Sequence, residues 1–240
     1  PGPQPESVRN RHNSGWVQCP GVEILKDTSR HDEMKTYVQG IMEHFKDDER
    51  VLIWDLYNEP GNTSGGRFEG VELGDEEKEV VSLALLKKAF AWAREVDPAQ
   101  PITVGVWRDL EPEMEDMPAL NRYSLEHSDI VSFHNYTDIE GMKNMVSILK
   151  PLGRPMICTE YMARTVDNTF QIMLPYLKEE NIGAINWGLV DGKSQTKFAW
   201  DSWYEEFPDE PDPWFHDIFR KDGTPYDSTE TKLIKRLNEE

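Results

Sequence analysis

The sequence lacks several features that would mark other protein classes. Its 240 residues include only two cysteines, Cys19 and Cys158. Because Cys158 lies inside an apolar, strand-like run, the sequence favours a free buried thiol over a disulfide. No apolar run approaches the length of a bilayer span, so no membrane contact is expected. The chain has no linker rich in Gly, Ser or Pro and no repeat of about 20–50 residues, so one large domain is expected.

Basic residues are also scarce. Lys and Arg number 26 against 45 Asp and Glu, which gives a formal net charge of −19. Binding to a phosphate backbone needs clustered Lys and Arg, so nucleic acid is excluded as a partner class and a neutral partner such as a sugar is favoured. The first residues, Pro-Gly-Pro-Gln-Pro-Glu, match neither an initiator sequence nor a signal peptide. The compartment therefore cannot be read from them.

Three signatures of other chemistries are missing as well. The six histidines are scattered, without HxH or HExxH spacing, so no metal site is expected. No Gly-rich phosphate loop follows a strand-like run, and no such run ends in the Lys that Schiff-base chemistry needs. We therefore expect neither a metal nor an organic cofactor.

Apolar runs that are typical of buried strands alternate with helical patterns. The expected strands cover 51–57, 102–107, 130–134, 155–159 and 183–188, and the expected helices cover 30–47, 75–96, 116–126, 138–150, 167–181 and the chain from about 228. This alternation predicts an α/β fold with parallel strand pairing. Turn-forming residues at 1–28 predict a long loop, and 204–240 is expected to be a closing tail that carries the last helix.

Aromatic, imidazole, amide and carboxyl groups occupy the ends of the expected strands. These residues are Asn58, Glu59, Trp107, His134, Tyr136, Glu160 and Trp187. In a (β/α)8 barrel the carboxyl ends of the strands form one rim, which carries the chemistry. Core packing alone would favour Val, Ile and Leu at such positions, so a sugar-binding site explains them better.

Two of these residues form a candidate catalytic pair. Glu59 and Glu160 each end an apolar run. Cleavage of a glycosidic bond needs one carboxyl to protonate the leaving oxygen and a second, ionised one to attack or stabilise the sugar. Glutamates at the ends of parallel strands can supply both groups.

Four motifs together resemble the clan A glycoside hydrolases, and family 5 most closely. The motifs are Trp-Asp-Leu-Tyr-Asn-Glu-Pro (54–60), Ser-Phe-His-Asn-Tyr (132–136), Cys-Thr-Glu-Tyr (158–161) and Ile-Asn-Trp-Gly (185–188). The resemblance covers about 51–203 and implies a (β/α)8, or TIM, barrel. It also implies a retaining enzyme that cleaves β-linked glucan, mannan or a related plant polysaccharide or glycoside, and it favours a secreted or periplasmic location.

The resemblance implies a role for each residue that matches the family's motifs. Glu59 would be the general acid/base and Glu160 the nucleophile. Asn58 would bind the sugar 2-hydroxyl, and Trp187 would lie under the −1 sugar. His134 and Tyr136 would orient the two carboxylates, and Trp107 is a further candidate for binding substrate.

The chain departs from the family in its number of strands. Family members have three more strand–helix units before the Asn-Glu strand, including an Arg that braces the nucleophile, and this chain shows none of them. About five of eight units cannot close a barrel. We therefore expect residues 1–240 to be the C-terminal portion of one barrel domain, strands 4–8, with the missing strands supplied by an upstream segment or a second polypeptide.

A second interpretation belongs to another class of protein. A catalytically inactive carbohydrate-binding barrel or scaffold protein would keep the same aromatic residues and lose turnover. His134 is also compatible with an ordinary core histidine, and Trp187 with core filling. The presence of both glutamates favours the enzyme, whereas the missing strands favour the inactive alternative.

Overall fold

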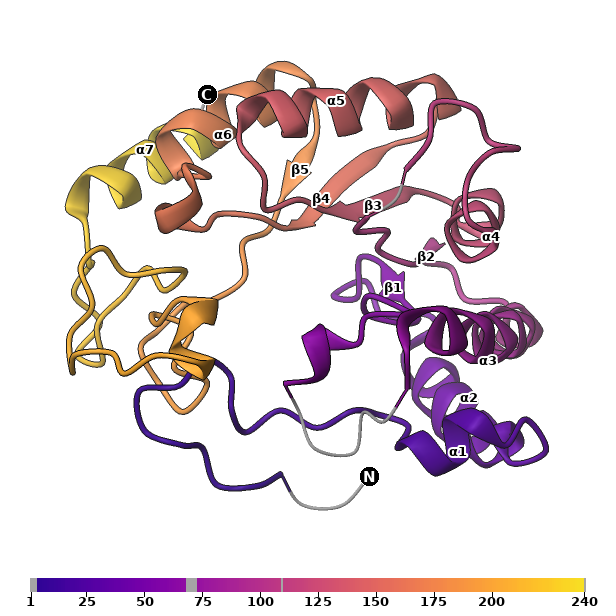
Figure 1. Ribbon diagram of the computed structural model, residues 1–240. Coiled ribbons are helices and arrows are strands. Elements are labelled where there is room, and N and C mark those ends of the chain that lie inside the picture. Colours follow the sequence, from indigo (N-terminus) through magenta and orange to yellow (C-terminus); the bar gives the residue numbers. More distant parts are fainter. Residues whose placement is uncertain (1–3, 68–72, 109, 240) are drawn as a thin grey trace. The chain divides into compact units, whose positions relative to one another are not determined.

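The computed structural model describes residues 4–67, 73–108 and 110–239, and its α/β fold contains parallel strand pairs (Figure 1). The chain divides into two compact units. Unit 1 consists mainly of 17–133 and 153–155, and unit 2 consists of 2–16, 134–152 and 156–240. The chain passes from unit 1 to unit 2 within strand β3. The prediction of a single barrel domain is not tested by this division.

Unit 1 begins with helices and continues into short strands. Its helices are α1 (Val22–Lys26), η1 (His31–Met34), α2 (Lys35–Phe45), η2 (Ser64–Gly66), α3 (Asp75–Val96) and α4 (Ala119–His127). Its strands are β1 (Trp54–Asp55), β2 (Ile102–Thr103) and most of β3 (Val131–His134). β1 and β2 pair in parallel, with Trp54 opposite Ile102. A parallel bridge joins Val106 to Phe133.

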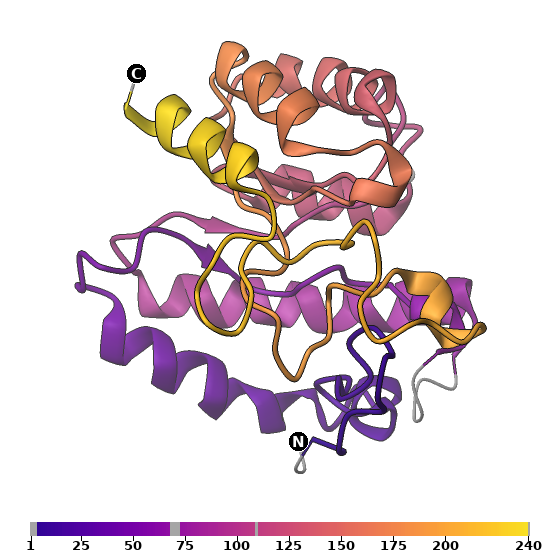
Figure 2. The same cartoon turned by 90° about the vertical axis from the view of Figure 1, so that its left-hand side faces the viewer.

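The core of unit 1 forms around α3. This helix lies beside α2 in both ribbon views (Figures 1 and 2). Its buried residues Leu86, Phe90 and Ala93 pack with Ile102 and Val104 from β2 and the residues after it. Burial of such side chains stabilises the unit by roughly 1.5–3 kcal/mol for each large one.

Unit 2 contains the later strands and helices. They are α5 (Ile139–Leu149), η3 (Lys150–Leu152), β4 (Met156–Glu160), η4 (Arg164–Val166), α6 (Phe170–Glu179), β5 (Gly183–Ala184), η5 (Trp200–Trp203) and α7 (Ser228–Glu239). β4 and β5 pair in parallel, with Ile157 opposite Gly183. Helices α6 and α7 pack against each other (Figure 2).

The described strands and α-helices lie where the apolar patterns predicted them, with two differences, and the short helices η2, η4 and η5 were not predicted. Strands β1, β2 and β5 have only two residues each and are therefore shorter than the expected runs. Part of the expected loop over 1–28 forms α1, whose Leu25 is fully buried. Glu23 in its first turn and Lys26 in its last turn complement the helix dipole.

The segment before residue 17 is bound to the C-terminal part of unit 2. The Asn13 amide donates to the Ser194 carbonyl at 2.6 Å. The His12 amide donates to Ser202 Oγ at 3.0 Å, and Trp203 Nε1 donates to the His12 carbonyl at 2.8 Å. This segment is therefore part of the packed structure of unit 2, although it has no regular secondary structure.

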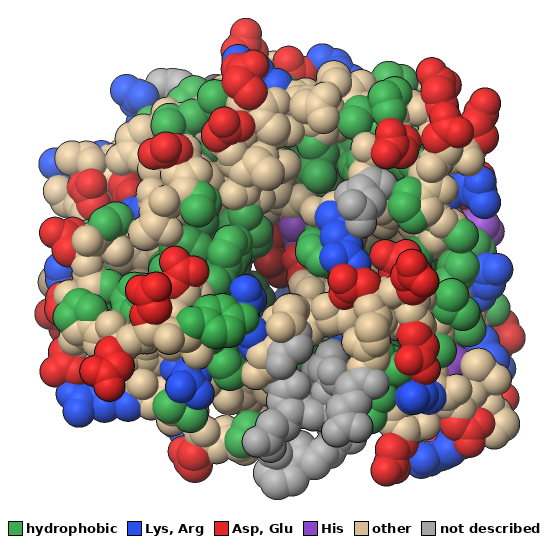
Figure 3. All heavy atoms as spheres, in the orientation of Figure 1, with side chains coloured by type: hydrophobic (Ala, Val, Ile, Leu, Met, Phe, Trp, Pro, Cys, Tyr) green, Lys and Arg blue, Asp and Glu red, His purple; other side chains and the backbone are tan. Residues whose placement is uncertain are grey.

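The chain has an acidic surface and two cysteines. Asp and Glu side chains are spread over the face in Figure 3. No helix among the described residues is long and apolar enough to cross a membrane. Cys19 and Cys158 are both free, and Cys158 is buried. Burial raises the pKa of the Cys158 thiol, so this side chain is a packed apolar group at neutral pH.

A buried ion pair anchors α7 to the segment after β4. The Arg164 guanidinium donates to both carboxylate oxygens of Glu230, at 2.8 and 2.6 Å. The two side chains are only 6% and 3% exposed.

We expect Glu230→Ala to lower the free energy of unfolding by about 3–5 kcal/mol, because it leaves the Arg164 charge buried without a carboxylate. Urea denaturation measures this loss. The matched control is Glu239→Ala in the same helix, which removes an exposed contact to Lys235 and is expected to cost less than about 1 kcal/mol. Equal losses in the two variants would contradict the prediction.

Candidate active site

In unit 1, Glu59 follows the end of β1 in a tight turn. β1 continues its pairing as far as Leu56, whose amide donates to the Thr103 carbonyl at 3.0 Å. Asn58 is exposed, and Glu59 is half-buried. The backbone of Glu59 has a φ of +43°, a left-handed conformation that few residues other than glycine adopt. Such backbone outliers are common at functional sites.

The residues after Glu59 match the type II turn. The Asn62 amide donates to the Glu59 carbonyl at 3.0 Å, which closes a four-residue turn. Pro60 occupies its second position, and Gly61, with a φ of +85°, occupies its third. Proline fixes the φ of the second position, and glycine supplies the positive φ of the third. The local sequence therefore dictates the turn that holds Glu59.

Two residues that the sequence analysis did not single out hold this turn in place: Asn62, which ends it, and Lys78. The side-chain amide of Asn62 donates to Glu59 Oε2, and Lys78 Nζ donates to the Asn62 carbonyl. Lys78 belongs to the first turn of α3 and is only 3% exposed. Burial lowers its pKa to about 8, although the neighbouring Asp75 carboxylate acts in the opposite direction.

Trp107 also belongs to unit 1. It directly follows Val106, which bridges to Phe133, and its indole is half-buried. The Arg108 guanidinium lies 4.4 Å from the centre of the Trp107 ring. This cation–π contact fixes the orientation of the indole.

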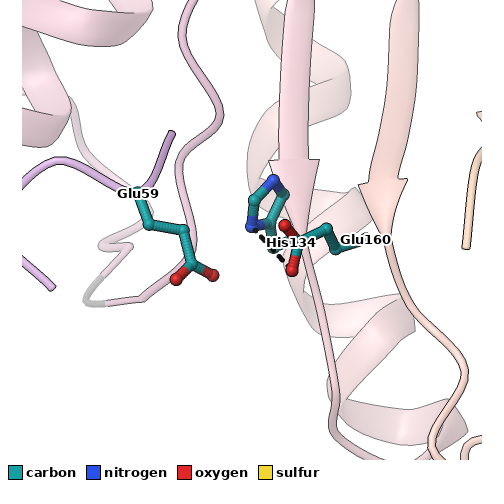
Figure 4. Close-up of side chains that lie close together, drawn as sticks. All are labelled: Glu59, His134 and Glu160. Carbon is teal, nitrogen blue, oxygen red and sulfur yellow. Dashed lines mark ion pairs between the residues drawn. The ribbon is translucent and has the colours of Figure 1, made fainter. Parts of the chain in front are cut away.

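In unit 2, Glu160 is the last residue of β4 and meets two of the predicted site residues. Tyr136 Oη donates to Glu160 Oε2 at 3.0 Å. Nδ1 of His134, at the end of β3, lies 3.6 Å from the same oxygen (Figure 4). The His134 and Glu160 side chains are 3% and 13% exposed. The Tyr136 hydroxyl and the His134 imidazole therefore both lie against the Glu160 carboxylate.

A buried asparagine holds the two loops that carry these residues. Asn168 is fully buried. Its Oδ1 accepts the Met162 amide at 2.9 Å, and its Nδ2 donates to the carbonyls of Asn135 and Thr137 at 3.1 and 2.8 Å. Asn168 therefore ties the loop after Glu160 to the backbone on both sides of Tyr136.

Aromatic rings surround Tyr136 within unit 2. Its ring centre lies 5.4 Å from that of Trp200, in an edge-to-face arrangement, and 5.3 Å from that of His216. His216 in turn lies 5.4 Å from His12. Burial, reinforced by His12, lowers the pKa of His216 to about 3, so His216 is neutral. Its Nδ1 donates to the Met162 carbonyl at 2.7 Å.

Trp187 follows β5 and keeps 36% of its surface exposed. The next residue, Gly188, has a φ of +88°. A Cβ there would lie 2.8 Å from the Cβ of His216, so only glycine fits. The exposed indole offers a face for stacking.

The structure thus groups the predicted residues within each unit. His134 and Tyr136 each contact Glu160 in unit 2, which also contains Trp187. Asn58, Glu59 and Trp107 belong to unit 1. The catalytic and binding roles of all seven remain predictions. The sequence analysis did not single out Asn62, Lys78 and Asn168, nor the ring contacts of His12 and His216.

A family model described as cellulase (glycosyl hydrolase family 5) matches residues 10–193. No curated protein matches the chain. Among solved structures, a psychrophilic family 10 endo-β-1,4-xylanase has a TM-score of 0.55 and 17% identity, over 87% of this chain and 68% of that one.

Two further solved structures are similar over most of this chain. The β-D-glucuronidase of Dictyoglomus thermophilum has a TM-score of 0.54 and 12% identity, over 89% of this chain and 36% of its own. The family 2 β-galacturonidase of Eisenbergiella tayi has a TM-score of 0.54 and 14% identity, over 91% and 38%. At these identities the likeness concerns the fold alone, and the chain spans little more than a third of either protein.

The turn after Glu59 supports a stability prediction. We expect Gly61→Ala to lower the free energy of unfolding by about 1–3 kcal/mol, because alanine is strained at a positive φ. In addition, its Cβ would lie 3.0 Å from both Glu79 Cγ and Leu120 Cδ2. Chemical denaturation measures the loss.

The control is Gly40→Ala in α2, where nothing lies within 4 Å of the added Cβ. Alanine in a helix interior is expected to stabilise the protein by about 0.5–1 kcal/mol. A neutral Gly61→Ala would show that the turn tolerates other conformations.

Proposed function

Because the chain belongs to glycosyl hydrolase family 5, we propose that it is a retaining glycoside hydrolase. Its substrate is a β-linked glucan, mannan or related plant polysaccharide or glycoside. The observation that carries this proposal is the environment of Glu160, a strand-end carboxylate that accepts the Tyr136 hydroxyl hydrogen bond and lies beside His134. The reaction needs no metal or organic cofactor, because two carboxyl groups suffice for it.

The environment of Glu160 supports its role as the nucleophile. Its side chain is only 13% exposed, and a buried carboxylate is costly unless donors satisfy it. The Tyr136 hydroxyl supplies such a donor to Oε2. Hydrogen bonding to the charged form favours ionisation, which the nucleophile requires.

In the proposed reaction, Glu160 and Glu59 act on opposite sides of one bond. A Glu160 oxygen attacks the anomeric carbon while Glu59 gives its proton to the glycosidic oxygen, and the leaving sugar departs. Glu59, now ionised, then takes a proton from water, and the resulting hydroxide attacks the anomeric carbon and releases Glu160. The two substitutions return Glu59 to its protonated form and retain the configuration.

Three further residues are proposed to bind the sugar. The exposed Asn58 amide hydrogen-bonds the 2-hydroxyl, and the exposed face of Trp187 stacks under the −1 ring. Trp107, held by Arg108, provides a second stacking face. Aromatic faces suit sugars because the axial C–H groups of the sugar ring pack against them.

We also propose that the described strands are strands 4–8 of a (β/α)8 barrel whose other strands come from an upstream segment or a second polypeptide. The described residues contain five strands, and the barrel fold has eight. Both residues of β5 are exposed, and so are the apolar Ile185, Leu189 and Val190 that follow it. A neighbouring strand would cover an edge of this kind.

The alternative function is a catalytically inactive barrel that binds carbohydrate. It shares the aromatic residues and differs only in turnover. Hydrolysis assays on aryl β-glycosides and on polysaccharides distinguish the two functions: binding without product release would favour the alternative.

The assigned roles predict different responses to two alanine substitutions. We expect Glu160→Ala to abolish turnover of every substrate. Glu59→Ala should slow unactivated substrates by about 100- to 10,000-fold, the usual contribution of general acid catalysis. It should spare glycosylation by aryl glycosides, because their phenolate departs without protonation. Steady-state kinetics on both substrate classes measure the difference.

The control is Glu140→Ala in α5, whose side chain is 75% exposed. It should leave all rates unchanged. If Glu59→Ala and Glu160→Ala lose the same activity on activated and unactivated substrates, the division of roles is wrong.

A second prediction follows from retention of the configuration at the anomeric carbon. NMR observation of the fresh reaction products should show the β anomer first, before mutarotation. A crystal structure of the full protein should place the two carboxyl groups about 5–5.5 Å apart, with Trp187 beside the gap. An α anomer, or carboxyl groups beyond roughly 6.5 Å, would indicate inversion and would exclude this mechanism.

A further inference from the structure

The hydrogen bonds of the Glu59 turn fix the orientation of one side chain in particular. Asn62 Oδ1 accepts the backbone amide of Ser64 at 2.7 Å. A backbone amide donates only, so the atom that faces it must be the amide oxygen of Asn62. The NH2 group of Asn62 is then the group that faces Glu59 Oε2. The orientation of this amide is therefore decided by its partners.

Asn62 is also held from α3. Lys78 Nζ donates to the Asn62 carbonyl, and Lys78 is 3% exposed. The neighbouring Thr63 hydroxyl donates to Asp75 Oδ1, at the start of the same helix, at 2.6 Å. The segment that carries Asn62 is thus attached to the first turn of the long helix α3.

We propose that Asn62 is a positioning residue for Glu59, which fixes the carboxyl plane and determines which of its two oxygens carries the catalytic proton. The inference rests on the proposed function. Oε2 accepts a hydrogen bond from Asn62, so in neutral Glu59 this oxygen remains the acceptor and the proton is carried by Oε1. The proton to be transferred is therefore always on the same side of the carboxyl group.

The same hydrogen bond from Asn62 acts differently on the carboxylate and on the carboxylic acid form of Glu59. An amide donor stabilises a carboxylate more than a carboxylic acid. Asn62 thus stabilises the carboxylate that forms when Glu59 gives its proton to the leaving oxygen in the first step. Lys78, Asp75 and Glu79 are charged groups of unit 1 that lie next to the turn, and substitution of Asn62 leaves all three unchanged.

Two substitutions test the inference through the pH at which Glu59 loses its proton. Asn62→Ala removes the donor. Asn62→Asp keeps the shape and the acceptor for Ser64 but places a second carboxylate against Oε2. Carboxyl carbon-13 NMR, with the Glu59 signal assigned from Glu59→Gln, should show this pH rising by about one unit in Asn62→Ala and by more in Asn62→Asp. A general loosening of the turn predicts no such order.

Kinetics provide a second, independent measurement. Asn62→Ala should slow substrates with poor leaving groups by about tenfold or more and should shift the alkaline limb of the pH profile to higher pH. In the Glu59→Ala background the same substitution should have no further effect, because Asn62 acts through Glu59.

The control is Gln100→Ala, which removes another buried side-chain amide of unit 1, one that bonds Trp54, Phe45 and Asp48. It controls for loss of stability alone and should leave the titration of Glu59 unchanged.

The outcomes separate the inference from the proposed function. An unchanged titration of Glu59 in both Asn62 variants would overturn the inference, whether or not the protein hydrolyses sugars. Additive kinetic effects of Glu59→Ala and Asn62→Ala would overturn it as well. The expected titration order in a protein without hydrolytic activity would support the positioning role and would reject the glycosidase.

Discussion

The hydrogen bonds of Asn168 are the constraint on which the site of unit 2 depends. This side chain is fully buried and joins the loop after β4 to the loop after β3. Buried polar groups are costly unless they are paired, so the two loops must adopt the one arrangement that satisfies the amide. In that arrangement the Tyr136 hydroxyl meets Glu160. The geometry around the carboxylate is thus set by a residue that does not contact it.

In unit 1 the position of Glu59 is also fixed by its surroundings, but here through the backbone. Glu59 is held by backbone conformation, since it has a positive φ and is followed by a Pro-Gly turn. In both units a buried charged side chain then attaches the loop to a helix. Lys78 of α3 binds the turn that carries Asn62, and Glu230 of α7 binds Arg164, four residues after Glu160. These contacts attach both loops to helices.

The sequence predicted some of these features and missed others for physical reasons. The apolar runs before Glu59 and Glu160 identified two strands, because burial on both faces leaves a continuous apolar pattern. Asn62 could have been identified from the sequence, because Glu-Pro-Gly-Asn carries the signature of a type II turn. Asn168 was not, because a loop asparagine has no local feature that shows whether it is buried. The edge-to-face contact of the His12 and His216 rings joins segments far apart in the chain, which no local pattern encodes.

The roles proposed for the two glutamates match the different environments of their side chains. Glu160 accepts a phenol hydrogen bond from Tyr136 and lies beside an imidazole, and the rings of Trp200 and the neutral His216 contact Tyr136. Glu59 accepts a hydrogen bond from the neutral Asn62 amide, in a turn that remains half-exposed. A nucleophile must stay ionised throughout binding, whereas an acid/base must change its charge twice in each cycle. A phenol donor with an imidazole beside it suits the first requirement. A neutral donor on one oxygen suits the second, because it orients the carboxyl group and leaves protonation of the other oxygen possible.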